Sequence, residues 1–274
     1  MSFLAVSPDA SYSYDGDTLD YVDAETIMQV CGNGLRFFSS RSGQQSFMWA
    51  KGSTGISAAT SHSKTKRFAY AMRTSNPEIY VHIFPENTLQ ATLKGGTDLE
   101  YSALTFSRDG RLLAGIGKLT DYKFAVWDIA SESLLKGGEI SLPVPCNFVS
   151  FNPLNPFQLC TGGEKGIFFW SLNRSYDTFY LVPTKGVIKV DNELDDGSLD
   201  EVEEEEEEED GPRNQFTSHC WSPDGGVYAS NMAGELIRFS FETGQVLECI
   251  QVGGGVIINA LLLMKEHLVC HSII

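Results

Sequence analysis

Apolar residues along the chain group into short runs that are separated by turn residues. Residues 146–172, "CNFVSFNPLNPFQLCTGGEKGIFFWSL", read as an apolar run, a turn, a second apolar run, a glycine turn and an aromatic run. Short runs of this kind, bounded by Gly, Pro, Asn and Asp, predict β-strands. Helical periodicity is nearly absent from the rest of the chain. The pattern therefore predicts an all-β protein.

The same unit recurs at a spacing close to 45 residues. The turn "FSRDG" lies 45 residues before "FNPLN", and His82 lies 45 residues before Trp127. In the first copy, residues 23–40, the same spacing selects Phe37. From "FNPLN" to "WSPDG" the spacing is 70, so 70 − 45 = 25 residues are inserted between those copies. A last copy starts near residue 256 and is not completed.

Internal repeats of 40–45 residues with four short strands each are typical of the blades of a β-propeller. We therefore predict an N-terminal extension over residues 1–16 and a WD40-like β-propeller over residues 17–274. The propeller should have about five full blades, a started sixth and an incomplete ring. A seven-bladed ring needs about 300 residues, and about 250 lie outside the insertion. We expect the apolar residues 256–274 to lack a partner sheet.

Two runs, "KFAVWDI" at 123–129 and "IFFWSL" at 167–172, are apolar at nearly every position. A strand with one wet face alternates, whereas a strand covered on both faces need not. The pattern therefore indicates sheets stacked face to face. The pairs Asp109-Gly110 and Asp224-Gly225 predict tight turns with a positive φ. We interpret the recurring aromatic residues as core first and partner contacts second.

The repeat turns resemble those of WD40 repeats, and Trp127-Asp128 is a WD dipeptide. The other copies end differently and lack the usual Gly-His pair, so the usual Ser-His-Asp-Trp hydrogen-bond network is not predicted. The structural repeat positions are Phe106, Asp109, Gly110, Trp127, Asp128, Phe151, Trp170, Trp221, Asp224, Gly225 and Phe239.

More specifically, four segments within residues 23–240 resemble the N-terminal propeller of the WD-repeat cilia- and flagella-associated proteins of the axonemal tether complex. They are "CGNGLRFFSSRSG", "LEYSALTFSRDGRLLAGIGKLTDYKFAVWDI", "FVSFNPLNPFQLCTGGEKGIFFWSL" and "TSHCWSPDGGVYASNMAGELI". The blade "SHCWSPDG" after an insertion favours the family of cilia- and flagella-associated protein forty-three over its sibling.

This resemblance implies a scaffold of the cytoskeleton, located in the axoneme of a cilium or flagellum. Members of the family are long proteins in which coiled coil follows the propellers. They help to tether inner-arm dynein heads to the doublet microtubule. The resemblance therefore implies other proteins as partners, namely a tether partner, the dynein arm or doublet components.

An acidic segment interrupts the repeat. Residues 191–210 contain 14 acidic residues and no basic one, so the rest of the chain carries −16 + 14 = −2. Such a run should be disordered, and we predict an acidic insertion over residues 190–212. A solvated spacer is the favoured interpretation. The alternative is a flexible arm for a basic partner, formed by Glu203, Glu204, Glu205, Glu206, Glu207, Glu208 and Glu209. Nucleic acid is excluded for this arm, because phosphate contacts need Lys and Arg.

Candidate chemistry is sparse. No secretory signal and no run of about 20 apolar residues is visible, so we predict a cytoplasmic protein with reduced cysteines and no membrane partner. The segments "GIGKLT" and "TGGEKG" lack the spacing of a phosphate loop and indicate hairpin turns. His219-Cys220 has no partner at ligand spacing and is interpreted as packed core. No catalytic, cofactor-binding or metal-binding residue is predicted, and no cofactor.

Three classes of function stay open. The favoured one is a non-catalytic WD-repeat scaffold in the ciliary or flagellar axoneme. The second is a general cytoplasmic WD40 adaptor that is unrelated to cilia, because one fold serves many functions. The third is a propeller enzyme with a site at the central channel, which the inner runs "SALTFS", "NFVSFN" and "SHCWS" disfavour because they contain no carboxylate cluster.

Overall fold

A computed structural model describes residues 19–52, 54–136, 145–188, 211–252, 255–264 and 267–271. Within these residues the chain forms 22 strands and one short 3-10 helix, η1 (Pro212–Asn214). The predicted extension over 1–16 lies outside the described residues, as does the acidic insertion over 190–212 apart from Gly211 and Pro212.

The described strands form five four-stranded sheets and one two-stranded sheet, and all the pairs inside them are antiparallel. We number these sheets as blades in chain order. Blade 1 contains β1 (Leu19–Tyr21), β2 (Thr26–Cys31), β3 (Gly34–Ser39) and β4 (Gln45–Trp49). Blade 2 contains β5 (Ile56–His62), β6 (Arg67–Met72), β7 (Ile79–Ile83) and β8 (Thr88–Leu93).

The remaining blades repeat this meander. Blade 3 contains β9 (Tyr101–Phe106), β10 (Leu112–Gly117), β11 (Phe124–Asp128) and β12 (Ser133–Lys136). Blade 4 contains β13 (Cys146–Phe151), β14 (Gln158–Gly163), β15 (Gly166–Ser175) and β16 (Thr178–Lys185). Blade 5 contains β17 (Phe216–Trp221), β18 (Val227–Asn231), β19 (Glu235–Phe239) and β20 (Val246–Gln251). Blade 6 contains only β21 (Ala260–Met264) and β22 (His267–His271).

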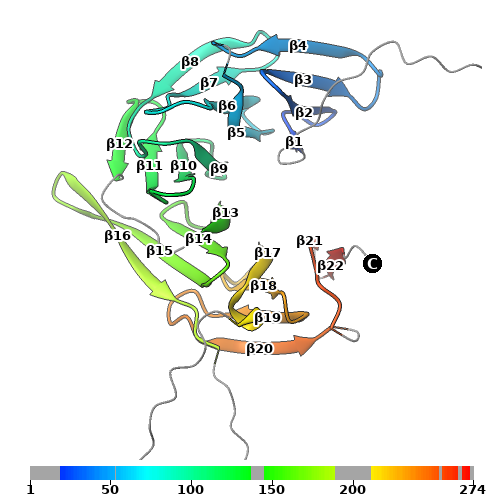
Figure 1. The fold of residues 1–274 in the computed structure, drawn as a ribbon, viewed down its shortest axis with the longest axis vertical. Coiled ribbons are helices and arrows are strands. Elements are labelled where there is room, and N and C mark those ends of the chain that lie inside the picture. The colour runs from blue at the N-terminus through cyan, green and yellow to red at the C-terminus, as the bar shows by residue number, and fades with distance from the viewer. Residues whose placement is uncertain are drawn as a thin grey trace, which may run out of the picture.

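The blades follow one another around an arc, with the first strand of each on the inside and the fourth strand on the outside (Figure 1). Among the described strands, none of blade 1 pairs with one of blade 6. These two blades lie at opposite ends of the arc and face each other across its open side (Figure 1). The prediction of five full blades and a started sixth in an incomplete ring is therefore confirmed.

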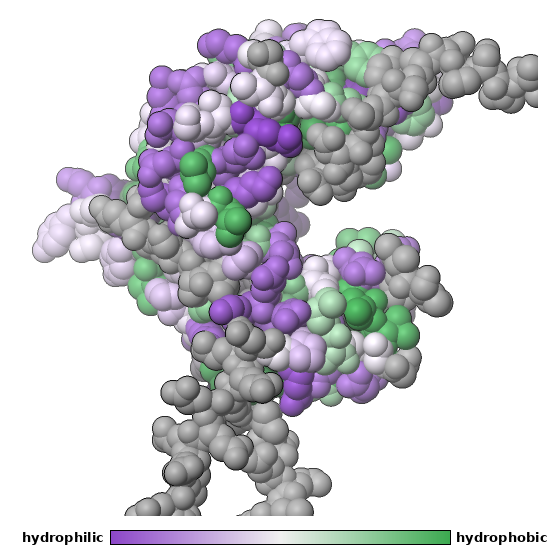
Figure 2. All heavy atoms as spheres, viewed as in Figure 1, coloured by the Kyte–Doolittle hydropathy of each residue, from purple (hydrophilic) through white to green (hydrophobic). Residues whose placement is uncertain are grey.

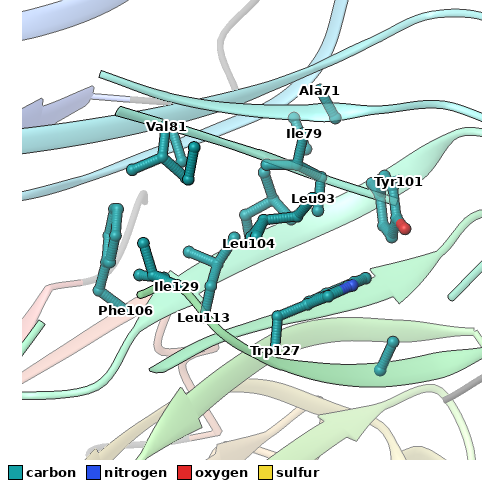
Figure 3. Packing of buried hydrophobic residues seen from close by; sticks show 14 residues of the cluster. Ala71, Ile79, Val81, Leu93, Tyr101, Leu104, Phe106, Leu113, Trp127 and Ile129 are labelled. Carbon is teal, nitrogen blue, oxygen red and sulfur yellow. The ribbon is translucent and has the colours of Figure 1, made fainter. Parts of the chain in front are cut away.

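Apolar side chains between neighbouring sheets hold the arc together. The described core divides into five clusters, and each joins two consecutive blades. The cluster between blades 2 and 3 is shown in Figure 3, where Ile79 and Val81 of β7 lie near Leu104 and Leu113 of blade 3. We call such a boundary between two blades a seam.

Strands in the middle of a blade are covered on both faces. Every residue of β10 and of β11 is buried, because one face belongs to the seam with blade 2 and the other to the seam with blade 4. In β11, Trp127 faces blade 2 whereas Phe124 and Val126 face blade 4. The continuous apolar runs in the sequence have this physical origin.

The recurring aromatic residues all face the preceding blade. Phe106, Phe151 and Trp221 end the first strands of their blades, and Trp127, Trp170 and Phe239 lie in the third strands. Each belongs to, or packs against, the cluster that its blade shares with the blade before it. The aromatic residues therefore recur in the sequence because each blade needs them at its boundary with the preceding blade.

Phe37 is an exception that corrects the sequence alignment. In blade 2, His82 pairs with Phe68, the second residue of β6. In blade 1, the residue that pairs with the second residue of β2 is Phe38. Phe37 points to the opposite face, where its ring lies 5.1 Å from that of Phe68 in blade 2. The true spacing in the first copy is thus 82 − 38 = 44 residues, and a slip of one residue inverts the face of a strand.

The two predicted Asp-Gly turns have the expected backbone. Gly110 has a φ of 70° and Gly225 a φ of 89°, which is the left-handed region that glycine adopts without a steric penalty. In each turn the preceding aspartate accepts a backbone hydrogen bond two residues ahead, from Arg111 N at 3.0 Å and from Gly226 N at 3.2 Å. These turns join the first strand of a blade to the second.

Trp170 gives the first test of the seams. This side chain is 3% exposed and fills the boundary between blades 3 and 4, so Trp170→Ala should lower the free energy of unfolding by about 3–5 kcal/mol through lost burial and a cavity. Trp49, at 76% exposed, is the matched control, and Trp49→Ala should melt close to wild type. Equal melting temperatures for Trp170→Ala and wild type would show that this boundary is not a core.

The two ends of the arc present sheet faces that no neighbour covers within the described residues. On blade 1, Leu19, Tyr21, Phe47 and Trp49 share the face opposite the seam with blade 2, and all four are exposed. On blade 6 the uncovered face presents Leu262, Met264 and Val269. In Figure 2 hydrophobic spheres gather beside the opening at this C-terminal end.

These uncovered faces lead us to expect self-association of the purified 274-residue chain, since exposed apolar patches of this kind promote association. Trp49→Glu and Leu262→Glu should each shift the sedimentation coefficient towards that of a monomer. Leu154→Glu, at a residue 58% exposed in a turn of blade 4, should not. A wild-type chain that sediments as a stable monomer would contradict the expectation.

Candidate protein-interaction site

The WD dipeptide occupies a structural position at the seam between blades 2 and 3. The indole Nε1 of Trp127 donates to the carbonyl oxygen of Lys94 at 3.0 Å. The buried carboxylate of Asp128 accepts from Arg111 Nε at 3.0 Å and from Ser131 N at 3.1 Å. Burial raises the pKa of Asp128, but the hydrogen bonds from Ser131 and Arg111 outweigh burial and hold it below its ordinary value. Both side chains are thus satisfied inside the fold.

The other two tryptophans at repeat positions use different partners. Trp170 Nε1 donates to Thr161 Oγ1 of the neighbouring strand at 2.9 Å. Trp221 is half-buried, and its Nε1 donates across the seam to Ser150 Oγ at 2.8 Å. The indole groups of these three tryptophans therefore donate to a backbone carbonyl, a threonine hydroxyl and a serine hydroxyl. None of the three donates directly to a histidine or an aspartate.

Ser150 of β13 and His219 of β17 form a polar link between blades 4 and 5. Ser150 Oγ lies 2.5 Å from His219 Nε2, and the His219 ring stacks on Phe148 with a centroid distance of 4.0 Å. The same hydroxyl accepts from Trp221, so Ser150 links both side chains of β17 to blade 4. Burial lowers the pKa of His219 to about 4, which keeps the ring neutral and able to accept.

Similar polar links cross the earlier seams. The backbone nitrogen of Ser61 donates to Asp20 Oδ2 at 3.0 Å, which joins β5 to β1. His62 Nε2 lies 2.9 Å from the carbonyl oxygen of Arg108, and Arg108 Nη1 in turn donates to the carbonyl oxygen of Pro153 at 3.1 Å. The inner ends of blades 1 to 4 are therefore connected by hydrogen bonds as well as by apolar packing.

Two of the cysteines, Cys146 and Cys160, are buried in the core. Burial raises the pKa of Cys146 to about 12 and that of Cys160 well above its ordinary value, so both stay protonated thiols. In the part of the chain that the structure describes, no three His, Cys, Asp or Glu side chains are grouped to hold a metal ion. Likewise, no helix among the described residues is long and apolar enough to cross a membrane.

The two glycine-rich segments are parts of hairpins. Gly115–Gly117 lies inside β10 and is buried, and its backbone pairs with β9 and β11. The segment 161–166 spans the end of β14, a two-residue turn at Glu164 and Lys165, and the start of β15. Neither segment leads into a helix that could hold a phosphate.

Exposed features lie on the outside of the arc. The hairpin of β15 and β16 is longer than the others, and its tip projects past β12 (Figure 1). At the tip, Tyr176 is 95% exposed, and Arg174 Nε donates to the Tyr176 carbonyl oxygen at 2.9 Å. The sequence analysis missed Tyr176 and the exposed Trp49, because single aromatic residues outside the repeat positions carry no periodic signal.

The predicted acidic arm, Glu203–Glu209, lies outside the described residues. Its attachment points are nevertheless described. Before the segment, Val187 N donates to the Gly244 carbonyl oxygen at 2.9 Å, which joins the chain to the β19–β20 turn of blade 5. After it, the carbonyl oxygen of Arg213 accepts from Asn231 Nδ2 at 3.0 Å, and Arg213 pairs with Glu235 at 2.8 Å. Both attachment points therefore lie on blade 5.

Comparison with known proteins finds similarity to two cilia- and flagella-associated proteins. No family model matches the chain. It is 25% identical over 260 residues to cilia- and flagella-associated protein 43 of Xenopus laevis, which covers 82% of this chain and 16% of that protein. It is 30% identical over 166 residues to cilia- and flagella-associated protein 44 of Mus musculus, which covers 59% of this chain and 9% of that protein.

The fold agrees with a solved propeller. The β-propeller domain of Cps50 (Swd1) from Myceliophteria thermophila superposes with a TM-score of 0.61 at 17% identity, over 79% of this chain and 63% of that one. The chain is a WD40-type propeller that resembles cilia- and flagella-associated protein 43. It spans 16% and 9% of the length of the two ciliary relatives above.

His219 gives a pH prediction for this propeller. In the unfolded chain a histidine binds a proton below a pH of about 6.5, whereas burial lowers the pKa of His219 to about 4 in the folded state. Between these values the unfolded state binds more protons, so the free energy of unfolding should fall as the pH drops from 7 to 4. His82, whose pKa is also lowered by burial, acts in the same direction.

Urea unfolding at pH 7.5 and pH 5.0, followed by tryptophan fluorescence, measures the effect. His219→Gln retains an acceptor for Ser150 but cannot be protonated, so its midpoint should shift less between the two pH values than that of wild type. His267→Gln, at an exposed residue of β22, should keep the wild-type shift. The same pH shift in His219→Gln and wild type would remove His219 as the cause.

Proposed function

We propose that this chain is a non-catalytic WD-repeat scaffold of the ciliary or flagellar axoneme. The observation that carries the proposal is the similarity to cilia- and flagella-associated protein 43 over 82% of the chain. By resemblance, its role is to help link inner-arm dynein heads to the doublet microtubule. The partners are then other proteins, namely a tether partner, the dynein arm or doublet components.

Two features of the fold favour binding over catalysis. The polar and aromatic side chains at the repeat positions are used for seams and turns, where their hydrogen bonds are already made. Exposed apolar residues lie at the ends of the arc, as Trp49 and Leu262 do, and in turns, as Leu154 does, where a protein can reach them. A scaffold needs accessible surface and a rigid frame, and this arrangement supplies both.

Location in the cell separates the axonemal role from that of a general cytoplasmic WD40 adaptor. A tagged full chain, expressed in a flagellated cell, should stay with the axoneme after detergent has removed the membrane and soluble matrix. Proximity labelling from the same tag should mark proteins of the tether and dynein arm. Complete release by detergent, with labelling of cytosolic proteins only, would favour the general adaptor.

A further inference from the structure

A cavity lies between blades 4 and 5, beside the turns that join their strands. Its volume is about 320 Å³, and it is partly open to solvent. One wall comes from Gln158 at the start of β14. The other walls come from blade 5, where the lining side chains are Asp224, Ser240, Phe241, Glu242 and Leu247. The cavity borders the seam between blades 4 and 5, because Phe241 belongs to the apolar cluster of that seam.

The charged groups of this cavity are acidic. Asp224 contacts Arg238, so its charge is partly neutralised. Glu242 is exposed at the rim, and no ion pair to it occurs among the described residues. The lining therefore carries a net negative charge that a cation would compensate. An anionic ligand would meet repulsion from the same group.

Apolar walls accompany this charge. Phe241 is 7% exposed, and its ring is fixed by Phe169 at 5.7 Å and by Trp221 at 5.8 Å between centroids. Leu247, which is 57% exposed, forms the opposite apolar surface. Ser240 and Gln158 add polar groups to the lining, and the Gln158 amide oxygen is held in place by Asn152 Nδ2 at 2.7 Å. A side chain with an aliphatic stem and a cationic head matches this combination of apolar walls and acidic rim.

The chain leads from this side of blade 5 into the acidic stretch of the sequence. Gly244, two residues after Glu242, binds Val187, and the acidic stretch of the sequence begins at Asp191, four residues later in the chain. The segment that contains these 14 acidic residues is therefore attached to the described chain beside blade 5. A concentration of one sign of charge raises the local concentration of oppositely charged ligands.

We propose that this cavity binds a lysine or arginine side chain of a partner protein. The Glu242 carboxylate pairs with the cationic head, while Phe241 and Leu247 pack against the aliphatic stem. The inference rests on the proposed role of the chain as a protein-binding scaffold and adds the chemistry of one contact. It does not depend on which cellular assembly the chain belongs to.

The test uses the purified full chain and a fluorescein-labelled peptide with four arginines spaced by glycine and serine. Fluorescence anisotropy at 150 mM salt should report binding of this peptide and little binding of its citrulline analogue, which has the same shape but no charge. Glu242→Gln should weaken binding about tenfold, as expected for the loss of one charged hydrogen-bond partner.

Glu86→Gln is the matched control. Glu86 is also exposed and lies in the turn between the third and fourth strands of blade 2, the position that Glu242 occupies in blade 5. This control should bind as wild type. Equal affinities of wild type and Glu242→Gln, equal losses in Glu86→Gln and Glu242→Gln, or full binding of the citrulline peptide would each overturn the proposal.

A third variant separates the cavity from the acidic stretch. Replacing Glu203–Glu209 by glutamine should weaken binding in general, yet adding Glu242→Gln to this variant should still weaken binding about tenfold further, since the two groups of charge act separately. Loss of that further effect would assign the binding to the acidic stretch and overturn the cavity. The peptide assay tests the cavity contact, and retention in the axoneme tests the proposed function. Retention of Glu242→Gln in the axoneme would leave the proposed function standing whatever the result of the peptide assay.

Discussion

Packing of one sheet face on the next is the interaction on which the rest of this structure depends. A four-stranded blade has two faces and cannot bury either by itself, so each blade depends on packing against a neighbour. The strands of blade 3 reach complete burial in β10 and β11 because blades 2 and 4 cover both sides. The same requirement makes the ends of the arc different from its middle. Blade 1 and blade 6 each have one face with a neighbour and one face without, among the described residues.

This constraint also explains what the sequence could predict. Every seam needs large side chains at the same place, so the aromatic residues recur at a nearly fixed spacing. The repeat, the number of blades and the glycine turns could therefore be predicted from the sequence. The alignment was wrong only at Phe37, in blade 1, where no sheet among the described residues precedes the blade and selects an aromatic residue at that place. Without that pressure, Phe37 and Phe38 are equally good matches to the period, and only the strand register separates them.

Contacts between distant residues could not be predicted. Ser150 and His219 lie 69 positions apart, and neither occupies a recurring position, so nothing in the sequence indicates that they meet. The cavity between blades 4 and 5 is equally hidden, since Gln158 and Leu247 come together only when two blades are stacked. A periodic sequence therefore reveals the frame of a propeller, whereas the particular surfaces that distinguish one propeller from another come from residues outside the period.

The accessible surfaces differ in the interaction that a partner would make with them, which is apolar packing at one and charge at the other. The end faces of the arc are apolar, so a contact there depends on buried area and changes little with salt. The cavity of blade 5 has the carboxylate of Glu242 at its rim, so a charged contact there weakens as salt screens it. Because the two kinds of surface lie on different parts of one rigid arc, a partner at one need not compete with a partner at the other. In the scaffold role proposed above, the arc therefore offers two physically different surfaces at separate places.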